Sequence, residues 1–197
     1  MLVLLDNGHG GLINGVYQTP GKRKDWGKSG IIYEGEFNRS IVNGLIEKLT
    51  QLGINYVNIA PEYRDVSLPT RVARANKYSY EDCFYLSVHS NAGGGQGGEV
   101  FTYYGETKSD QIATIWGEEF KREFPNKPLR TDYRDGDLDK EASFYVIRKT
   151  VMPAILTENF FMDNYEEFSE ILTSQEGRKK IINYHLNTIL RVKNELF

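Results

Sequence analysis

The sequence predicts a single α/β domain. Short apolar stretches alternate with segments of helical periodicity along the whole chain. No internal repeat, low-complexity tract or linker-like stretch divides it. The 197 residues, 40% of them apolar, suffice for one hydrophobic core. We therefore expect one domain spanning residues 1–197.

The first third of the chain predicts two strands around one helix. The apolar run at residues 2–5 predicts a buried strand. A loop rich in Gly and Lys follows at residues 8–33, and loops of this length are usually functional or mobile. Apolar residues at helical spacing predict a helix over residues 37–52, which Gly53 ends. Residues 54–59 predict the next strand.

The middle of the chain predicts a helix and two further strands. Residues 69–78 predict a helix with Pro near its first turn. Residues 84–88 form an apolar run that predicts a strand. The glycine-rich stretch 93–98 predicts a loop, and residues 99–104 predict another strand. The glycines do not indicate a phosphate-binding loop, because no Lys-Ser/Thr pair and no helix follows them.

The last third predicts two long helices separated by short strands. The apolar residues of 112–124 recur at helical spacing. Residues 125–141 are polar and predict an irregular segment. Short strands are predicted at residues 144–147 and 154–157, and a striped helix is predicted from about 175 to 196.

The overall charge and composition exclude several classes of protein. The net charge of −3 gives no sign of a nucleic-acid-binding surface. No apolar run approaches the ~20 residues that cross a bilayer, so no transmembrane segment is expected. The single cysteine, Cys83, excludes an intramolecular disulfide framework and is expected to be buried.

Three short motifs carry most of the chemistry. They are Leu-Asp-Asn-Gly-His-Gly-Gly at 5–11, Ser-Val-His-Ser-Asn-Ala at 87–92 and Leu-Thr-Glu-Asn-Phe-Phe-Met-Asp-Asn at 156–164. Each follows a predicted strand, so His9, His89 and Glu158 are expected just past strand ends. Ligands of open α/β sheets bind at the carboxyl ends of the strands. The motifs therefore predict a site at one rim of the sheet.

Two histidines and an acid at one rim suggest a zinc hydrolase. A catalytic zinc takes three protein ligands and keeps one position for water, and His9, Glu34 and His89 would supply those ligands. Glu158 is the candidate general base and acid. Asp6 is expected to accept the second ring N–H of a ligating histidine. Asn91, two residues after His89, is expected to hold the site or contact the substrate.

The chain resembles the zinc-dependent N-acetylmuramoyl-L-alanine amidases, which are cell-wall hydrolases of bacteria and of phage endolysins. The resemblance rests on motifs in the family's order: Asp-x-Gly-His-Gly-Gly (6–11), Glu-x-x-x-Asn (34–38), Ser-Leu-x-x-Arg-x-x-x-Ala-Asn (67–76), Ser-x-His-x-Asn-Ala (87–92), Gly-Glu-Val-Phe (98–101) and Met-Pro-Ala-Ile-Leu-x-Glu-x-x-Phe-x-x-Asn (152–164). It implies one zinc ion per chain, held by His9, Glu34 and His89, and a catalytic Glu158. Asn38, at the family spacing, favours Glu34 over Glu36 as the ligand.

The resemblance also implies the fold and the reaction. The fold would be a mixed, mostly parallel sheet of about six strands with helices on both faces. The reaction would be hydrolysis of the amide between N-acetylmuramic acid and the first L-alanine of the stem peptide in bacterial peptidoglycan. Two alternatives remain: a zinc peptidase cutting within the stem peptide, and a non-catalytic wall-binding protein on the same scaffold.

Several residues have structural interpretations beside the functional ones. His185 lies on an apolar helical stripe and is expected to pack there without binding metal. Arg71 is expected to anchor loops by pairing with carboxylates. A structural salt bridge is the alternative for Glu158.

The start of the chain bears on its route to the cell wall. Residues 1–5 already predict a core strand, without the basic region or cleavage site of a signal peptide. We expect a monomer made in the cytoplasm that reaches the wall as a phage endolysin does. A longer protein, with its leader or wall-binding module removed, would look identical.

Overall fold

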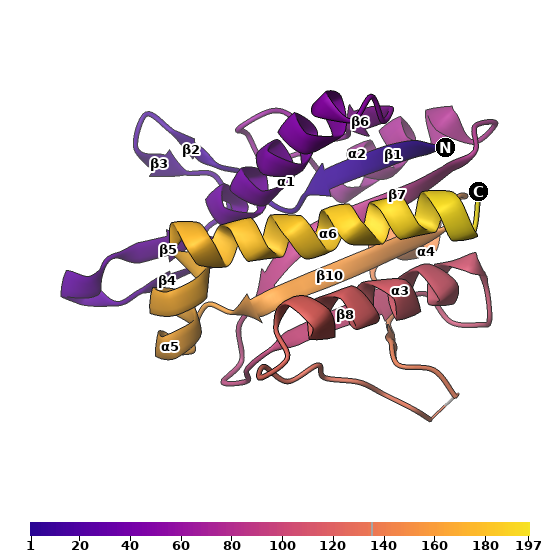
Figure 1. Ribbon diagram of the computed structural model, residues 1–197. Coiled ribbons are helices and arrows are strands. Elements are labelled where there is room, and N and C mark those ends of the chain that lie inside the picture. Colours follow the sequence, from indigo (N-terminus) through magenta and orange to yellow (C-terminus); the bar gives the residue numbers. More distant parts are fainter. Residues whose placement is uncertain (135) are drawn as a thin grey trace.

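A six-stranded mixed sheet forms the centre of the protein in the computed structural model, which describes residues 1–134 and 136–197 (Figure 1). The strands lie in the order β6 (Tyr56–Asn58), β1 (Leu2–Asn7), β7 (Cys83–Asn91), β10 (Ala154–Phe161), β8 (Gly98–Thr102) and β9 (Lys140–Glu141). The first four are mutually parallel, whereas β8 runs antiparallel to β10 and parallel to β9. The expected mixed, mostly parallel sheet is confirmed.

Helices cover both faces of the sheet, as expected. One face carries α1 (Glu34–Gln51), α3 (Lys108–Glu123) and α6 (Gln175–Glu195), and the other carries α2 (Leu68–Ala75) and α4 (Tyr145–Lys149) (Figure 1). A hydrophobic core lies on each face of the sheet. Alternate residues of a strand pack in one core or the other, since successive side chains point to opposite faces. Val3 and Leu5 pack in the core under α1, α3 and α6, whereas Leu4 packs in the core under α2 and α4.

The helix ends follow ordinary capping chemistry. The Ser67 hydroxyl caps α2, and Pro69 lies in its first turn. Thr107 and Asp110 form a capping box at the start of α3. Ser174 caps α6. Shorter elements complete the chain: 3₁₀ turns at Gly27–Ser29 and Asn76–Tyr78, the single turn α5 (Tyr165–Glu167) and a π-helical turn at Phe168–Leu172.

The long loop expected at residues 8–33 contains two β-hairpins. They are formed by β2 (Leu12–Ile13) with β3 (Val16–Tyr17), and by β4 (Arg23–Asp25) with β5 (Ile31–Tyr33). Both project past the sheet at the end where the parallel strands finish (Figure 1). We call the β4–β5 hairpin, residues 23–33, the arm.

Three expected elements have different bounds in the structure. The strand expected at 144–147 is wrong, because that segment forms the short helix α4, which buries Val146 and Ile147 against the sheet. Both β7 and β10 run several residues beyond their expected ends at 88 and 157. His89 and Glu158 therefore lie within strands, and only His9 follows a strand end.

Both chain ends lie at the end of the molecule where β1 begins (Figure 1). Among the described residues, no helix is long and apolar enough to span a membrane.

Candidate active site

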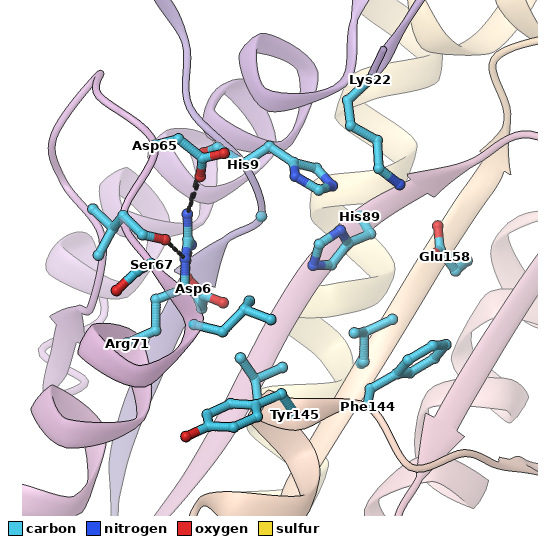
Figure 2. A pocket seen from close by; sticks show the side chains of 15 residues that line it. Asp6, His9, Lys22, Asp65, Ser67, Arg71, His89, Phe144, Tyr145 and Glu158 are labelled. Carbon is cyan, nitrogen blue, oxygen red and sulfur yellow. Dashed lines mark hydrogen bonds and ion pairs between the residues drawn. The ribbon is translucent and has the colours of Figure 1, made fainter. Parts of the chain in front are cut away.

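The candidate functional side chains of the strands project from the face of the sheet that α2 and α4 cover. Asp6 lies two residues after Leu4, and His89 lies four after Tyr85, so all four point to this face. Glu158 is the cross-strand partner of His89. With His9, the side chains of Asp6, His89 and Glu158 line a cavity of about 570 Å³ at the carboxyl ends of β1, β7 and β10, and Figure 2 shows the rings of His9 and His89 side by side with Glu158 next to His89.

His9 sits in a tight turn directly after β1. Its backbone has φ +67°, a left-handed conformation that non-glycine residues rarely adopt. Gly8 permits the approach of the two imidazoles, because a Cβ there would lie 2.0 Å from Cε1 of His89. The ring centroids of His9 and His89 are 5.0 Å apart. The Asn38 amide donates to the Gly8 carbonyl at 3.0 Å and fixes the turn against α1.

Glu34, the first residue of α1, brings a carboxylate to both histidines. Its Oε1 lies 3.0 Å from Nδ1 of His89 and 3.1 Å from Nε2 of His9. The side chain is 2% exposed. Burial alone would raise the pKa of Glu34, but the contacts with His89 and His9 hold it well below its usual range. Glu36 instead accepts a hydrogen bond from the Leu12 amide, away from the histidines.

These three residues fit a metal ion. One ligand atom from each of His9, Glu34 and His89 lies within 4.8 Å of the others. Two imidazole nitrogens and a carboxylate oxygen are the donor set of catalytic zinc sites. Burial lowers the pKa of His89, although Glu34 opposes this, so its ring is held towards the neutral form that binds metals. Nε2 of His9 is buried without a well-aligned hydrogen bond, which fits a nitrogen atom that binds a metal ion.

Glu158 faces the same cavity without a partner. Its Oε2 is buried and makes no hydrogen bond, and no ion pair involves this residue within the described chain. Burial and the nearby charge of Glu34 raise the pKa of Glu158 well above its usual range, and Lys22 opposes them. The alternative of a structural salt bridge therefore finds no support in the geometry.

Asp6 reaches the histidines only through a neighbour. Its carboxylate accepts hydrogen bonds from Tyr85 at 2.6 Å and from Ser87 at 2.9 Å, and it pairs with Arg71. Ser87 Oγ in turn lies 3.2 Å from Nε2 of His89. The expected direct contact between Asp6 and a ligating ring is thus wrong, since Ser87 stands between them.

Arg71 joins this network to the loop before α2. Its guanidinium is 2% exposed, pairs with Asp6, and reaches Asp65 at 3.5 Å. It also donates to the carbonyls of Asn7 and Val66 at 2.8 Å each. Arg71 therefore anchors loops as expected, by bridging two carboxylates.

Asn91 does not line the cavity. Its side-chain amide donates to Glu99 on β8, on the far side of β10, at 2.6 Å, and its side-chain carbonyl oxygen accepts from the Ala92 amide. The side chain thus links β7 to Glu99, the cross-strand partner of Glu158, and whether it also contacts the substrate stays a prediction.

Sequence reasoning missed the residues of the cavity rim. Nζ of Lys22, just before the arm, lies 3.8 Å from Oε2 of Glu34. Phe144 and Tyr145, at the start of α4, line the opposite wall (Figure 2). No spacing rule singles out Lys22 in a loop rich in Lys, and Phe144 lay in a segment expected to be a strand.

Two residues expected to be structural are confirmed as such. His185 is fully buried on α6, behind the sheet, between Thr157 and Trp116. Cys83 is buried and free at the start of β7.

Comparisons with known proteins agree with this geometry. A family model described as N-acetylmuramoyl-L-alanine amidase matches residues 3–191. The chain is 37% identical over 130 residues to the N-acetylmuramoyl-L-alanine amidase CwlM of Bacillus licheniformis, a match covering 66% of this chain and 47% of that protein. It is 28% identical over 199 residues to the endolysin of Bacillus phage SPP1, covering 98% of this chain and 66% of that protein.

A solved structure shares the fold over the full length. The N-acetylmuramoyl-L-alanine amidase of Clostridium difficile 630 superposes with a TM-score of 0.79 at 23% identity, covering 100% of this chain and 98% of that chain. The matched region thus spans about half of CwlM but nearly all of the solved amidase chain.

Proposed function

Since the chain belongs to the N-acetylmuramoyl-L-alanine amidase family, we propose that it hydrolyses the amide between N-acetylmuramic acid and the L-alanine of the stem peptide in bacterial peptidoglycan. The observation that carries the proposal is the convergence of His9, Glu34 and His89 beside Glu158 in one cavity. Residues 1–197 would form the catalytic domain. The relationship to a phage endolysin and to bacterial amidases fits action on the cell wall.

We propose that His9, Glu34 and His89 hold one zinc ion. When bound, zinc lowers the pKa of a coordinated water from ~15.7 towards ~7 and polarises a carbonyl oxygen. The residues' own task is to present two neutral imidazoles and one carboxylate in a fixed array. The turn at His9, the first turn of α1 and strand β7 fix these three positions independently.

Glu158 would move the proton of the reaction. Its carboxylate would take a proton from the attacking water and pass it to the leaving amine nitrogen. The raised pKa of Glu158 suits this task, because the carboxylate is a stronger base and can keep the proton until the amine leaves. Its unpartnered Oε2 is free to make that hydrogen bond.

Digestion of purified peptidoglycan tests the proposed reaction. We expect free stem peptides with a new N-terminal alanine by mass spectrometry, lost with a chelator and restored by zinc. Products cut within the stem peptide would instead establish the peptidase. Binding to the wall without products, with zinc present, would overturn the enzymatic function.

The variant Glu158→Gln tests the role of the acid. It should keep zinc bound while kcat falls about 10²-fold or more, a typical scale for general acid–base catalysis. Glu34→Gln should instead lower the zinc content. The matched control is Glu36→Gln, whose side chain can still accept from the Leu12 amide and which should keep both zinc and activity. A near-normal kcat in Glu158→Gln would contradict the assigned role.

A further inference from the structure

A second group of metal-ligating side chains lies away from the catalytic cavity. Asp110 on α3 and Asp137 and Asp139 before β9 each place a carboxylate oxygen within 4.8 Å of the other two. None of the three lines the cavity that holds Glu158. We call these three residues the aspartate cluster. The proposed amidase reaction makes no use of it.

Two members of the cluster, the buried Asp139 and the half-buried Asp137, each have one buried oxygen atom without a partner. Asp139 is 1% exposed, and its Oδ2 accepts from Thr102, which is fully buried. Its Oδ1 is buried with no hydrogen-bond partner, and so is Oδ1 of Asp137. Buried carboxylate oxygens are normally hydrogen-bonded or bound to a cation. Two such orphaned oxygens within one cluster indicate a missing ligand.

The described part of the chain offers the cluster no cationic partner. Within residues 1–134 and 136–197, no Lys, Arg or His forms an ion pair with Asp110, Asp137 or Asp139. Burial, the close approach of the Asp137 carboxyl to that of Asp139, and the charges of Asp137 and Asp110 raise the pKa of Asp139 to about 7, although the hydrogen bond from Thr102 opposes them. The three carboxylates therefore need either a shared proton or a bound cation.

We propose that the aspartate cluster binds a hard divalent cation of the Ca²⁺ class. Its donors are all oxygens, namely three carboxylates and the neighbouring Thr102 hydroxyl, which favours Ca²⁺ over zinc. Asp137 and Asp139 alternate along the chain, as ligands do in calcium loops. Asp110 and Asp137 line a surface hollow of about 380 Å³, through which water can reach the ion and complete its shell.

A cation here would tie three elements together. Asp110 already caps the start of α3 through its Oδ2. Asp139 precedes β9, the outermost strand of the sheet, and Thr102 ends β8. The ion would thus fasten residues 137–139 to the sheet edge and to α3. This role is separate from the proposed amidase chemistry.

Thermal unfolding with added calcium tests the proposal. The zinc-loaded protein, freed of other metals by dialysis, is scanned at pH 7.5 with 0 to 5 mM CaCl₂. We expect Tm to rise by about 5 °C at saturation, with one calcium bound per chain in calorimetry. Asp137→Asn and Asp139→Asn should each lose the shift. The control Glu47→Gln, which removes an exposed acid on α1, should keep it.

Other outcomes would overturn the proposal. Absence of binding to the wild type does so directly, and so does a calcium shift that persists in both variants. A Tm of Asp139→Asn at or above the wild type, with the wild type indifferent to calcium, would establish a shared proton. If the variants do not fold, NMR spectra of the wild type with added Mn²⁺ test the site instead. Broadening of the amide signals of residues 102, 110 and 137–139 supports the site, and broadening only of other amide signals contradicts it.

Discussion

At the scale of single residues, His89 is held through both of its ring nitrogens. Asp6 is buried beside Arg71, which keeps the pKa of this carboxyl below its usual value despite the opposing effect of burial. The ionised Asp6 accepts a hydrogen bond from the Ser87 hydroxyl. Because that hydroxyl has only one proton, Ser87 Oγ accepts a hydrogen bond from Nε2–H of His89. That tautomer leaves the lone pair of Nδ1, 3.0 Å from Glu34 Oε1, available to the proposed zinc ion.

We therefore expect Ser87→Ala to weaken zinc binding. The loss of the residue that orients His89 should raise the zinc Kd about 10-fold, the lower end of such effects at other metal sites. Competition with a chromogenic chelator measures it. The control is Ser90→Ala, on the same strand, whose hydroxyl donates to the Phe160 carbonyl and does not touch His89. Equal zinc affinity in both variants would contradict the orienting role.

His185 makes the stability of the protein depend on pH. Trp116 donates to its Nε2, so its Nδ1–H donates to the Ile181 carbonyl, and the ring is neutral. Burial lowers the pKa of His185 to about 4 from 6.5, although the Ile181 carbonyl opposes it. The unfolded chain thus binds this proton more tightly, and stability is lost as pH falls from 6.5 towards 4.

The expected loss from His185 is about 2 to 3 kcal/mol between pH 7 and pH 4.5. Urea unfolding at both pH values, in the wild type and in His185→Gln, measures it. The wild type should lose that much more stability than the variant, since the other titrating groups are common to both. Equal losses in the two proteins would contradict the prediction, because they would show that His185 binds its proton equally well in the folded and the unfolded state.

Sequence spacing located the site residues but not their supports. His9, His89 and Glu158 follow apolar runs, and that pattern alone predicts one rim. The role of Ser87 depends on its cross-strand neighbour Asp6, 81 residues away, which no local pattern reveals. The alternation of the strand predicts that Asn91 shares the face of His89, but not that its amide reaches Glu99 on β8, beyond β10.

At the scale of elements, local propensity fails where tertiary packing decides. The run Tyr145-Val146-Ile147 is typical of a strand, yet the segment crosses the sheet face as a single helical turn that buries Val146 and Ile147. The strands β7 and β10 extend beyond the apolar runs that predict them, because their backbones continue to pair with neighbouring strands at polar residues. The long helices, by contrast, were predicted well, because their apolar stripes span several turns.

The arm beside the cavity is anchored by one tryptophan. Nε1–H of Trp26 donates to the Met162 carbonyl at 3.1 Å, and its ring packs on Tyr165 at 5.1 Å and on Phe168 at 5.8 Å. Behind the arm, the Lys22 carbonyl accepts from the amide of Glu34. The position of Trp26 therefore bears on the first turn of α1, where the proposed metal ligand Glu34 lies.

We expect Trp26→Ala to release the arm while the sheet stays folded. Proteolysis within residues 19–33 should accelerate at least 10-fold, because cleavage follows local opening. The amidase activity should fall more steeply than Tm. The control Val16→Ala changes an exposed side chain of the other hairpin and should leave both unchanged. An unchanged digestion pattern in Trp26→Ala would contradict the anchoring role.

At the scale of the whole molecule, the proposed zinc ligands come from segments far apart in the sequence. His9 follows β1, Glu34 begins α1 and His89 lies on β7, at the centre of the sheet. An ion bound by all three favours the folded state, because the unfolded chain does not preform the site.

Zinc should therefore raise the thermal stability. At 100 times Kd the added stability is about 2.7 kcal/mol, which corresponds to a rise in Tm of about 5 to 10 °C. Differential scanning calorimetry of the chelated and zinc-loaded protein measures it. His9→Ala should lose most of the rise, whereas Glu158→Gln should keep it. An unchanged Tm on zinc addition would contradict the three-ligand site.

The placement of the chain ends has a practical consequence for protein engineering. Both ends lie where β1 begins, and the cavity opens at the opposite ends of β1, β7 and β10 (Figure 1). A partner module fused at either end would extend away from the cavity, leaving room for a polymer as large as the cell wall. Because both ends lie at one end of the molecule, a linker that joins them need not cross the cavity, so circular permutation is feasible with new ends at the exposed turn around Gly105.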